Sequence, residues 1–321
     1  MESTTPVMTT MRSYERDAAI KNSKENVNKS NQKAMSAPPV AKPTLAQRFL
    51  SIFAAGPVKP GESYGAPGQG KSLAISIATA LVLIGFWYIA TYLQWVKPLF
   101  LPSPGAVVAR FWEVATEGFA NATLLEHTGW SMMRVFSAFI LAALTAIPIG
   151  IFMGVNRVAR GLFDPIIEFY RPLPPLAYLP LVIIWLGIGE VSKVVLIYLA
   201  IFAPMALSAR AGVKSVAIEQ IHAAFSMGAS RWQVIRHIIL INAMPEILTG
   251  MRIGIGFGWT TLVAAEMVAA QAGLGFMVLN AAEFLVTDVV IMGIIVIGII
   301  AYLFDMLMRY GEKKLVPWKG R

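Results

Sequence analysis

The stretch Ser72–Val96 reads SLAISIATALVLIGFWYIATYLQWV and contains no charged side chain. A helix needs about 20 consecutive apolar residues to cross the hydrocarbon core of a bilayer. The stretch therefore predicts a transmembrane helix. The composition agrees, because 56% of the residues are hydrophobic and only 14% are charged, whereas a soluble domain carries about 25% charged residues. The chain is predicted to be an integral membrane protein.

Other charge-poor runs follow along the chain, at 135–156, 172–189, 194–209, 247–265 and 289–304. The shorter ones can still cross where long basic side chains reach the interface. The apolar stretch 267–282 is short and interrupted by Gly273 and Gly275, so we expect a short or re-entrant helix there. The expected fold is all-α, with six transmembrane helices, of which the first is Ser72–Val96.

The basic residues predict the orientation. With both termini in the cytoplasm, 23 of the 27 Lys and Arg residues lie inside, and only Lys97, Arg110, Arg134 and Lys193 lie outside. Such a bias is typical of membrane proteins, so the net charge of +9 indicates a membrane surface and no nucleic acid. In the predicted outer segment 97–134, Ser103 and Pro104 predict the start of a helix.

The residues before the first span form two predicted regions. Residues 1–43 are polar without apolar periodicity, which predicts a disordered cytoplasmic tail. In 44–71, one apolar stripe over 44–55 predicts a short helix, either on the membrane surface or against another subunit. A Gly/Pro-rich linker covers 56–70. The transmembrane domain is then 72–321.

Residues 65–72 (GAPGQGKS) match the phosphate-binding pattern G-x-x-x-x-G-K-S. That loop needs a buried strand before it and a soluble helix after it. Here Pro57, Pro60 and Gly61 precede it and a lipid-length apolar run follows, so we expect no nucleotide there. The chain has no cysteine and only three scattered histidines, and we expect neither a metal site nor another cofactor.

The polar segment 210–246 lies on the predicted cytoplasmic side, and it contains the sequence EQIHAAFSMGAS over 219–230. Small residues permit a close backbone approach to a partner. Gly228 lets the chain turn into the next helix, for which Ser230 is the expected cap.

This segment resembles the EAA loop of ABC importer permeases, E-A-A-x-x-x-G followed by I-x-L-P. His222 replaces a glutamate of that pattern and Ile241 replaces its proline. The resemblance implies that the loop couples to an ATPase through Glu219, His222, Ala223, Ala224, Gly228, Ala229, Ser230 and Arg231. The alternative is an ordinary cytoplasmic amphipathic loop.

Wider stretches are similar to the sulfonate, taurine and nitrate branch of these permeases, namely 99–104, 163–180, 245–252, 258–266 and 273–277. The resemblance implies an inner-membrane permease that imports a small sulfonate, with taurine favoured over other sulfonates and nitrate. It also implies two ATPase subunits that hold the ATP and Mg²⁺, a periplasmic binding protein and a second copy of the chain. A secondary transporter and a non-conducting assembly subunit are the alternatives.

The candidate residues of the solute path are Pro174, Pro175, Tyr178, Trp259, Thr260, Thr261 and Glu266. Prolines at the start of a span indicate either a gating helix or a kinked packing helix. An ionisable residue at membrane depth suggests function, and Glu266 is expected either to meet an ammonium group or to lie in water at the outer interface. Gly250, Gly254 and Gly258 form a stripe that favours close helix packing.

Overall fold

The computed structural model describes residues 72–318, and the predictions for 1–71 lie outside them. The elements are the helices α3 (Ser72–Tyr92), α4 (Pro104–Thr116), α5 (Leu124–Val155), α6 (Arg157–Tyr170), α7 (Pro175–Leu186), α8 (Glu190–Lys214), α9 (Ile218–Ser226), α10 (Arg231–Val234), the π-helical turn η1 (Ile235–Ile239), α11 (Leu240–Ala269), α12 (Leu274–Glu283) and α13 (Thr287–Leu315). The residues that the structure describes contain no strand. The all-α prediction is confirmed.

Five of the described helices are long and apolar enough to cross a membrane, namely α3, α5, α8, α13 and the continuous run from α10 to α11. The pair α6 and α7 passes the same test only jointly, and its two helices meet at a bend of 107°. The described chain thus has five spans, or six if the bent pair is one.

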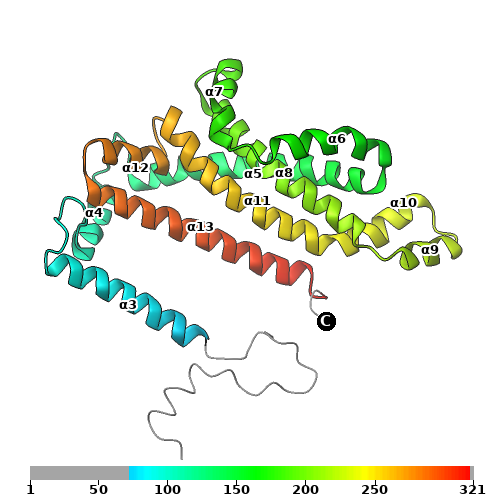
Figure 1. Ribbon diagram of the computed structural model, residues 1–321, viewed down its shortest axis with the longest axis horizontal. Helices are drawn as coiled ribbons and strands as arrows, with labels where there is room; N and C mark the ends of the chain where they lie inside the picture. Colours follow the sequence, from blue (N-terminus) through cyan, green and yellow to red (C-terminus); the bar gives the residue numbers. More distant parts are fainter. Residues whose placement is uncertain (1–71, 319–321) are drawn as a thin grey trace, which may run out of the picture. The chain divides into compact units, whose positions relative to one another are not determined.

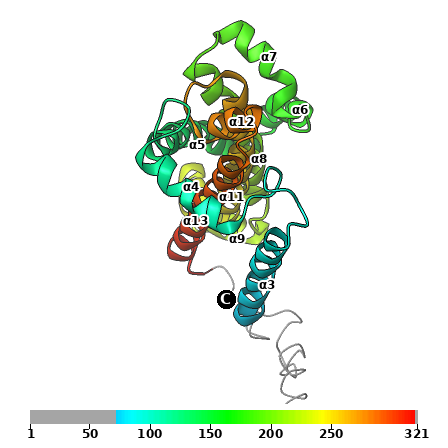
Figure 2. The same cartoon turned by 90° about the vertical axis from the view of Figure 1, so that its left-hand side faces the viewer.

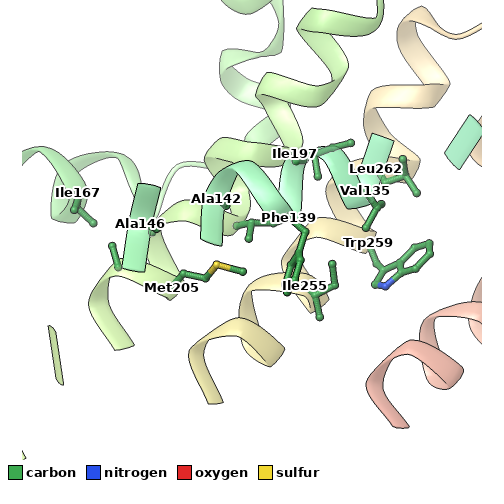
Figure 3. Close-up of a cluster of buried hydrophobic side chains, with 14 of the residues drawn as sticks. Val135, Phe139, Ala142, Ala146, Ile167, Ile197, Met205, Ile255, Trp259 and Leu262 are labelled. Carbon is green, nitrogen blue, oxygen red and sulfur yellow. The ribbon is translucent and has the colours of Figure 1, made fainter. Parts of the chain in front are cut away.

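Helix α8 packs against α5 on one side and α11 on the other (Figures 1 and 2). Their shared core consists mainly of aliphatic and aromatic side chains, and Figure 3 shows Ala142, Ile197 and Leu262 as members of this cluster. A buried side chain of this size contributes about 1.5–3 kcal/mol when it leaves water. In lipid that term is missing, so close packing must hold these helices together.

Glycines make the close packing possible. A Cβ on Gly250 would lie 2.3 Å from Cβ of Ser208, and one on Gly258 would lie 2.7 Å from Cδ1 of Ile201. Both partners belong to α8, so the predicted packing role of the glycine stripe on α11 is confirmed. On α5, a Cβ on Gly150 would lie 2.3 Å from the backbone oxygen of Ala206.

The structure differs from the predicted third span, 172–189. Helix α7 covers only Pro175–Leu186, and α6 precedes it over residues that were expected to lie in a cytoplasmic loop. Pro172, Pro174 and Pro175 supply no backbone N–H. The helix is therefore interrupted by a turn between Tyr170 and Pro175.

Several helices are longer than the charge-poor runs that predicted them. Helix α5 begins at Leu124 and α8 at Glu190, while α13 ends at Leu315. Each extension includes charged residues. The predicted start of α4 is confirmed, because Ser103 Oγ accepts a hydrogen bond from Ala106 N at 3.2 Å and Pro104 is the first helical residue.

The antiparallel helices α8 and α11 define two ends. Helices α9 and α10 lie at one end, which we call the α9 end, and α12 lies at the other, the α12 end (Figure 1). Helix α13 runs from the α12 end toward the α9 end. These names are used below in place of inside and outside.

Candidate functional site

The loop at the α9 end has a well-defined turn. Helix α9 ends at Ser226, and Gly228 has φ +84°, in the left-handed region that favours glycine. Its N–H donates to Phe225 O at 2.9 Å, and the N–H of Ala229 donates to Ala224 O at 3.0 Å. The predicted turning role of Gly228 is confirmed.

The next helix begins with a capping box, since Ser230 Oγ accepts from Gln233 N, and Gln233 Oε1 accepts from Ser230 N. Arg231 is the first residue of α10, and Ser230 is its N-cap, as predicted. Of the predicted coupling residues on α9, Glu219, His222 and Ala223 are exposed, whereas Ala224 is buried. Their role in coupling stays a prediction.

An exposed apolar surface surrounds this turn. Met227 is 82% exposed, Trp232 66%, and Ile218 and Phe225 are also exposed. Beneath it, Ala224 packs with Val234, Ile239 and Ala243 in a separate cluster that fixes the loop on α8 and α11. We call the residues Ile218, Phe225, Met227 and Trp232 the loop patch.

A second candidate site is a cavity of about 460 Å³ beside the break between α6 and α7. Its walls come from residues 170–175 and Tyr178, from α8 and from α11. Three predicted path residues, Pro174, Pro175 and Tyr178, line it.

The remaining path candidates do not line this cavity. Trp259 and Thr261 are buried within the bundle, and Glu266 is buried at the α12 end. Thr260 is exposed, and its hydroxyl donates to Phe257 O at 2.9 Å. Phe257 does line the cavity, so Thr260 lies one turn from it on α11.

Glu266 belongs to a buried ion cluster at the α12 end. Its side chain is 0% exposed, so the interpretation of a residue in water is wrong. Arg134 Nη1 donates to Glu266 Oε1 at 2.7 Å, and Arg134 forms two further bonds with the Glu190 carboxylate at 2.6 and 2.8 Å. Lys193 Nζ pairs with Glu190 Oε1 at 2.8 Å. The Glu266 carboxylate is thus already paired with a guanidinium.

The cluster also holds the chain that leads into α12. Arg134 donates to Ala272 O, Gly273 N–H donates to His127 Nδ1, and Gly275 N–H donates to Glu266 Oε2, at 2.7 to 3.0 Å. Gly273 has φ +139°, and a Cβ there would lie 2.5 Å from Glu266 Oε1. Only glycine fits between these charges.

Sequence reasoning missed this cluster because it counted Arg134 and Lys193 as solvated charges outside the membrane. The available signal was helical spacing, since His127, Ser131 and Arg134 share one face of α5. Ser131 Oγ donates to Glu266 and accepts from Leu274 N at 2.9 Å.

Comparison with known proteins assigns the chain that carries these sites to a family. Residues 146–317 match the model of the binding-protein-dependent transport system inner membrane component. This match covers α6 to α13, including the α9 loop, the cavity and Glu266. The chain belongs to this family.

Curated relatives of this permease extend the similarity. It is 55% identical over 251 residues to the taurine transport system permease protein TauC of Escherichia coli, covering 78% of this chain and 91% of that one. It is 32% identical over 236 residues to the putative aliphatic sulfonates transport permease protein SsuC of the same organism, covering 74% and 88%. With the riboflavin transport system permease protein RibX of Chloroflexus aurantiacus, identity is 29% over 242 residues, covering 75% and 89%.

The solved structure of the MetNI methionine ABC transporter in inward-facing conformations has a similar fold. The TM-score is 0.52 at 17% identity, covering 60% of this chain and 95% of that one. The permease therefore has the ABC importer fold. It is a multi-pass inner-membrane transport component and not an enzyme, because ATP hydrolysis in ABC systems belongs to a separate ATPase subunit. As a member of this family, it works with an ATPase subunit and a binding protein.

Proposed function

We propose that this permease imports taurine, as two copies with two ATPase subunits docked at the α9 end and a periplasmic binding protein at the α12 end. Both termini are then cytoplasmic, and the chain itself binds no cofactor, since ATP and Mg²⁺ are held by the ATPase. Other sulfonates and nitrate are the alternative substrates. The higher identity to a taurine permease than to a sulfonate permease supports taurine.

The loop patch is the observation that carries this proposal. Four large apolar side chains are exposed around a glycine turn, beyond the apolar part of α8 and α11. Exposed apolar surface of this kind marks interaction sites. A partner protein bound to the turn would move α8, α11 and the buried Ala224 cluster together. Such rigid-body movement is a common way for proteins to switch between two conformations.

The charge distribution supports the proposed orientation. Exposed Arg157, Lys214, Arg231 and Arg236 gather at the α9 end, which suits a cytoplasmic face. At the α12 end, the cations of Arg110, Arg134 and Lys193 are each paired with a carboxylate.

The Met227→Asp variant tests the proposal in proteoliposomes that contain the permease, its ATPase and its binding protein. We expect ATP-driven uptake of radiolabelled taurine by the wild type. In the variant, the ATPase should bind at least roughly tenfold more weakly, because a charge buried unpaired at an interface costs several kcal/mol. Co-purification of the ATPase and the uptake rate measure the effect.

Ile188→Asp is the matched control, because Ile188 is 79% exposed at the α12 end and Met227 is 82% exposed at the α9 end. This variant should keep the ATPase bound. Equal ATPase loss in both variants, or uptake by the permease without ATPase in an ion gradient, would contradict the proposal. Uptake of another sulfonate or nitrate in place of taurine would correct the substrate.

A further inference from the structure

The cavity beside the α6–α7 break is largely apolar but has a small polar set. Of the side chains that line it, only Tyr170, Arg171, Tyr178 and Ser208 are polar. Binding sites for small molecules commonly combine apolar walls with a few polar groups that fix the ligand. The volume of about 460 Å³ is ample for a small organic ion.

The hydroxyl of Tyr170 is the unusual member of this set. It is buried and has no hydrogen-bond partner anywhere in residues 72–318. Buried polar atoms are nearly always bonded, and each exception needs an explanation such as water or a ligand. Tyr170 stands at the end of α6, immediately before the proline-rich break, so its unpartnered hydroxyl belongs to a residue of the cavity wall.

The cavity also has an acceptor on α8. Pro204 lies inside this helix and has no N–H to bond the carbonyl of Ala200, four residues earlier. Both residues line the cavity. An open backbone carbonyl at membrane depth is tolerated where it faces protein or a water-filled space. Without an amide partner at Pro204, the Ala200 carbonyl can accept a hydrogen bond from a cationic group of a ligand.

We propose that this cavity is a binding site within the permease for a small zwitterion with a sulfonate group. The hydroxyls of Tyr170 and Ser208 and the guanidinium of Arg171 donate to the sulfonate oxygens. The carbonyl of Ala200 accepts from the ammonium group. This inference rests on the proposed function, and it assigns part of the substrate selection to this chain.

The test uses the full-length permease with its ATPase in lipid nanodiscs, with equilibrium binding of radiolabelled taurine as the readout. Tyr170→Phe keeps the ring and removes only the hydroxyl. We expect its affinity for taurine to fall roughly tenfold to hundredfold, because a hydrogen bond to a charged group is lost. Its melting temperature should stay the same or rise, since the hydroxyl has no protein partner to lose.

Tyr198→Phe is the matched control. Tyr198 packs in the same bundle, but its hydroxyl lies 3.1 Å from Thr145 Oγ1 and forms a hydrogen bond with it. This variant should lose some thermal stability and keep its affinity for taurine. We thus expect Tyr170→Phe to lower only the affinity for taurine and Tyr198→Phe to lower only the melting temperature. A general defect in the bundle does not produce that pattern.

Competition by ethanesulfonate tests which end of the ligand Tyr170 holds. Ethanesulfonate carries the sulfonate without the ammonium, so Tyr170→Phe should weaken it by the same factor as taurine. Unchanged taurine affinity in Tyr170→Phe, with the wild type importing taurine, would overturn the site and leave the proposed function standing. No taurine binding by the wild type would also overturn the site, whereas failure of the proposed function requires that no taurine be imported with ATPase and binding protein present.

Discussion

Replacing Arg134 with methionine is expected to destabilise the permease by about 3–5 kcal/mol, because it leaves a buried charge without its partner. The guanidinium is 2% exposed and the Glu266 carboxylate 0%. Glu266 would keep its bonds to Ser131 and Gly275 N–H but lose its only cation within residues 72–318. The melting temperature of the purified protein in detergent measures the loss.

Two further variants make this prediction specific. In Arg134→Met combined with Glu266→Gln, the uncompensated buried charge is absent, so the double variant should be more stable than Arg134→Met alone. Arg110→Met removes a cation that is 27% exposed and pairs with Asp288 and Glu113, and we expect it to cost less than about 1 kcal/mol. If Arg134→Met melts at the same temperature as Arg110→Met, the cluster does not stabilise the fold.

Gly150→Ala is expected to destabilise the contact between α5 and α8 by about 1–3 kcal/mol, as overpacking does in tight interiors. The new methyl group would lie 2.3 Å from the backbone oxygen of Ala206 and 2.7 Å from Cβ of Ala209. A backbone oxygen inside a helix cannot rotate away, so the two helices must separate. Thermal unfolding in detergent checks this as well.

Gly129→Ala provides the matched control on the same helix. Apart from the neighbouring backbone of α5, no atom of residues 72–318 would lie within 4 Å of a Cβ on Gly129. Alanine is the better helix former by about 0.5–1 kcal/mol, so this variant should be as stable as the wild type or slightly more so. A loss of stability in Gly129→Ala equal to that in Gly150→Ala would show that the close approach of α5 to α8 does not matter.

The sequence predicted the local features well. Ser103, Gly228 and Ser230 act at the helix ends where their chemistry places them, because caps and left-handed turns depend on a few neighbouring residues. The packing stripe on α11 was also predictable, since spacing alone puts its glycines on one face. For Gly150 the same spacing with Gly154 was present on α5 but was not recognised.

Helix lengths were not predictable from charge-free runs. Helix α8 includes Glu190 and Lys193, which an apolar-run criterion treats as a boundary. In the structure Glu190 pairs with both Lys193 and Arg134. The charge of Lys193 is paired within α8, whereas Arg134, the second partner of Glu190, lies far away in the sequence on α5.

The candidate path was predictable only in part for a related reason. Pro174, Pro175 and Tyr178 marked the cavity, because prolines interrupt a helix wherever they occur. Tyr170 and Ser208 gave no signal, since one lies at the end of an amphipathic helix and the other on α8. Their proximity depends on the placement of α6 beside α8, where Arg210 pairs with Asp164, and this is a tertiary feature.

The uninterrupted run from Arg231 to Val268 has a mechanical consequence. It comprises 38 residues, and at about 1.5 Å per residue it is roughly 57 Å long. A bilayer with its headgroups is only about 40–45 Å thick. Where the run is neither strongly tilted nor bent, one end projects beyond the lipid, and at the α9 end the projecting part begins directly after Ser230. A protein bound there in the aqueous phase would contact the same continuous helix that carries Glu266 near its other end.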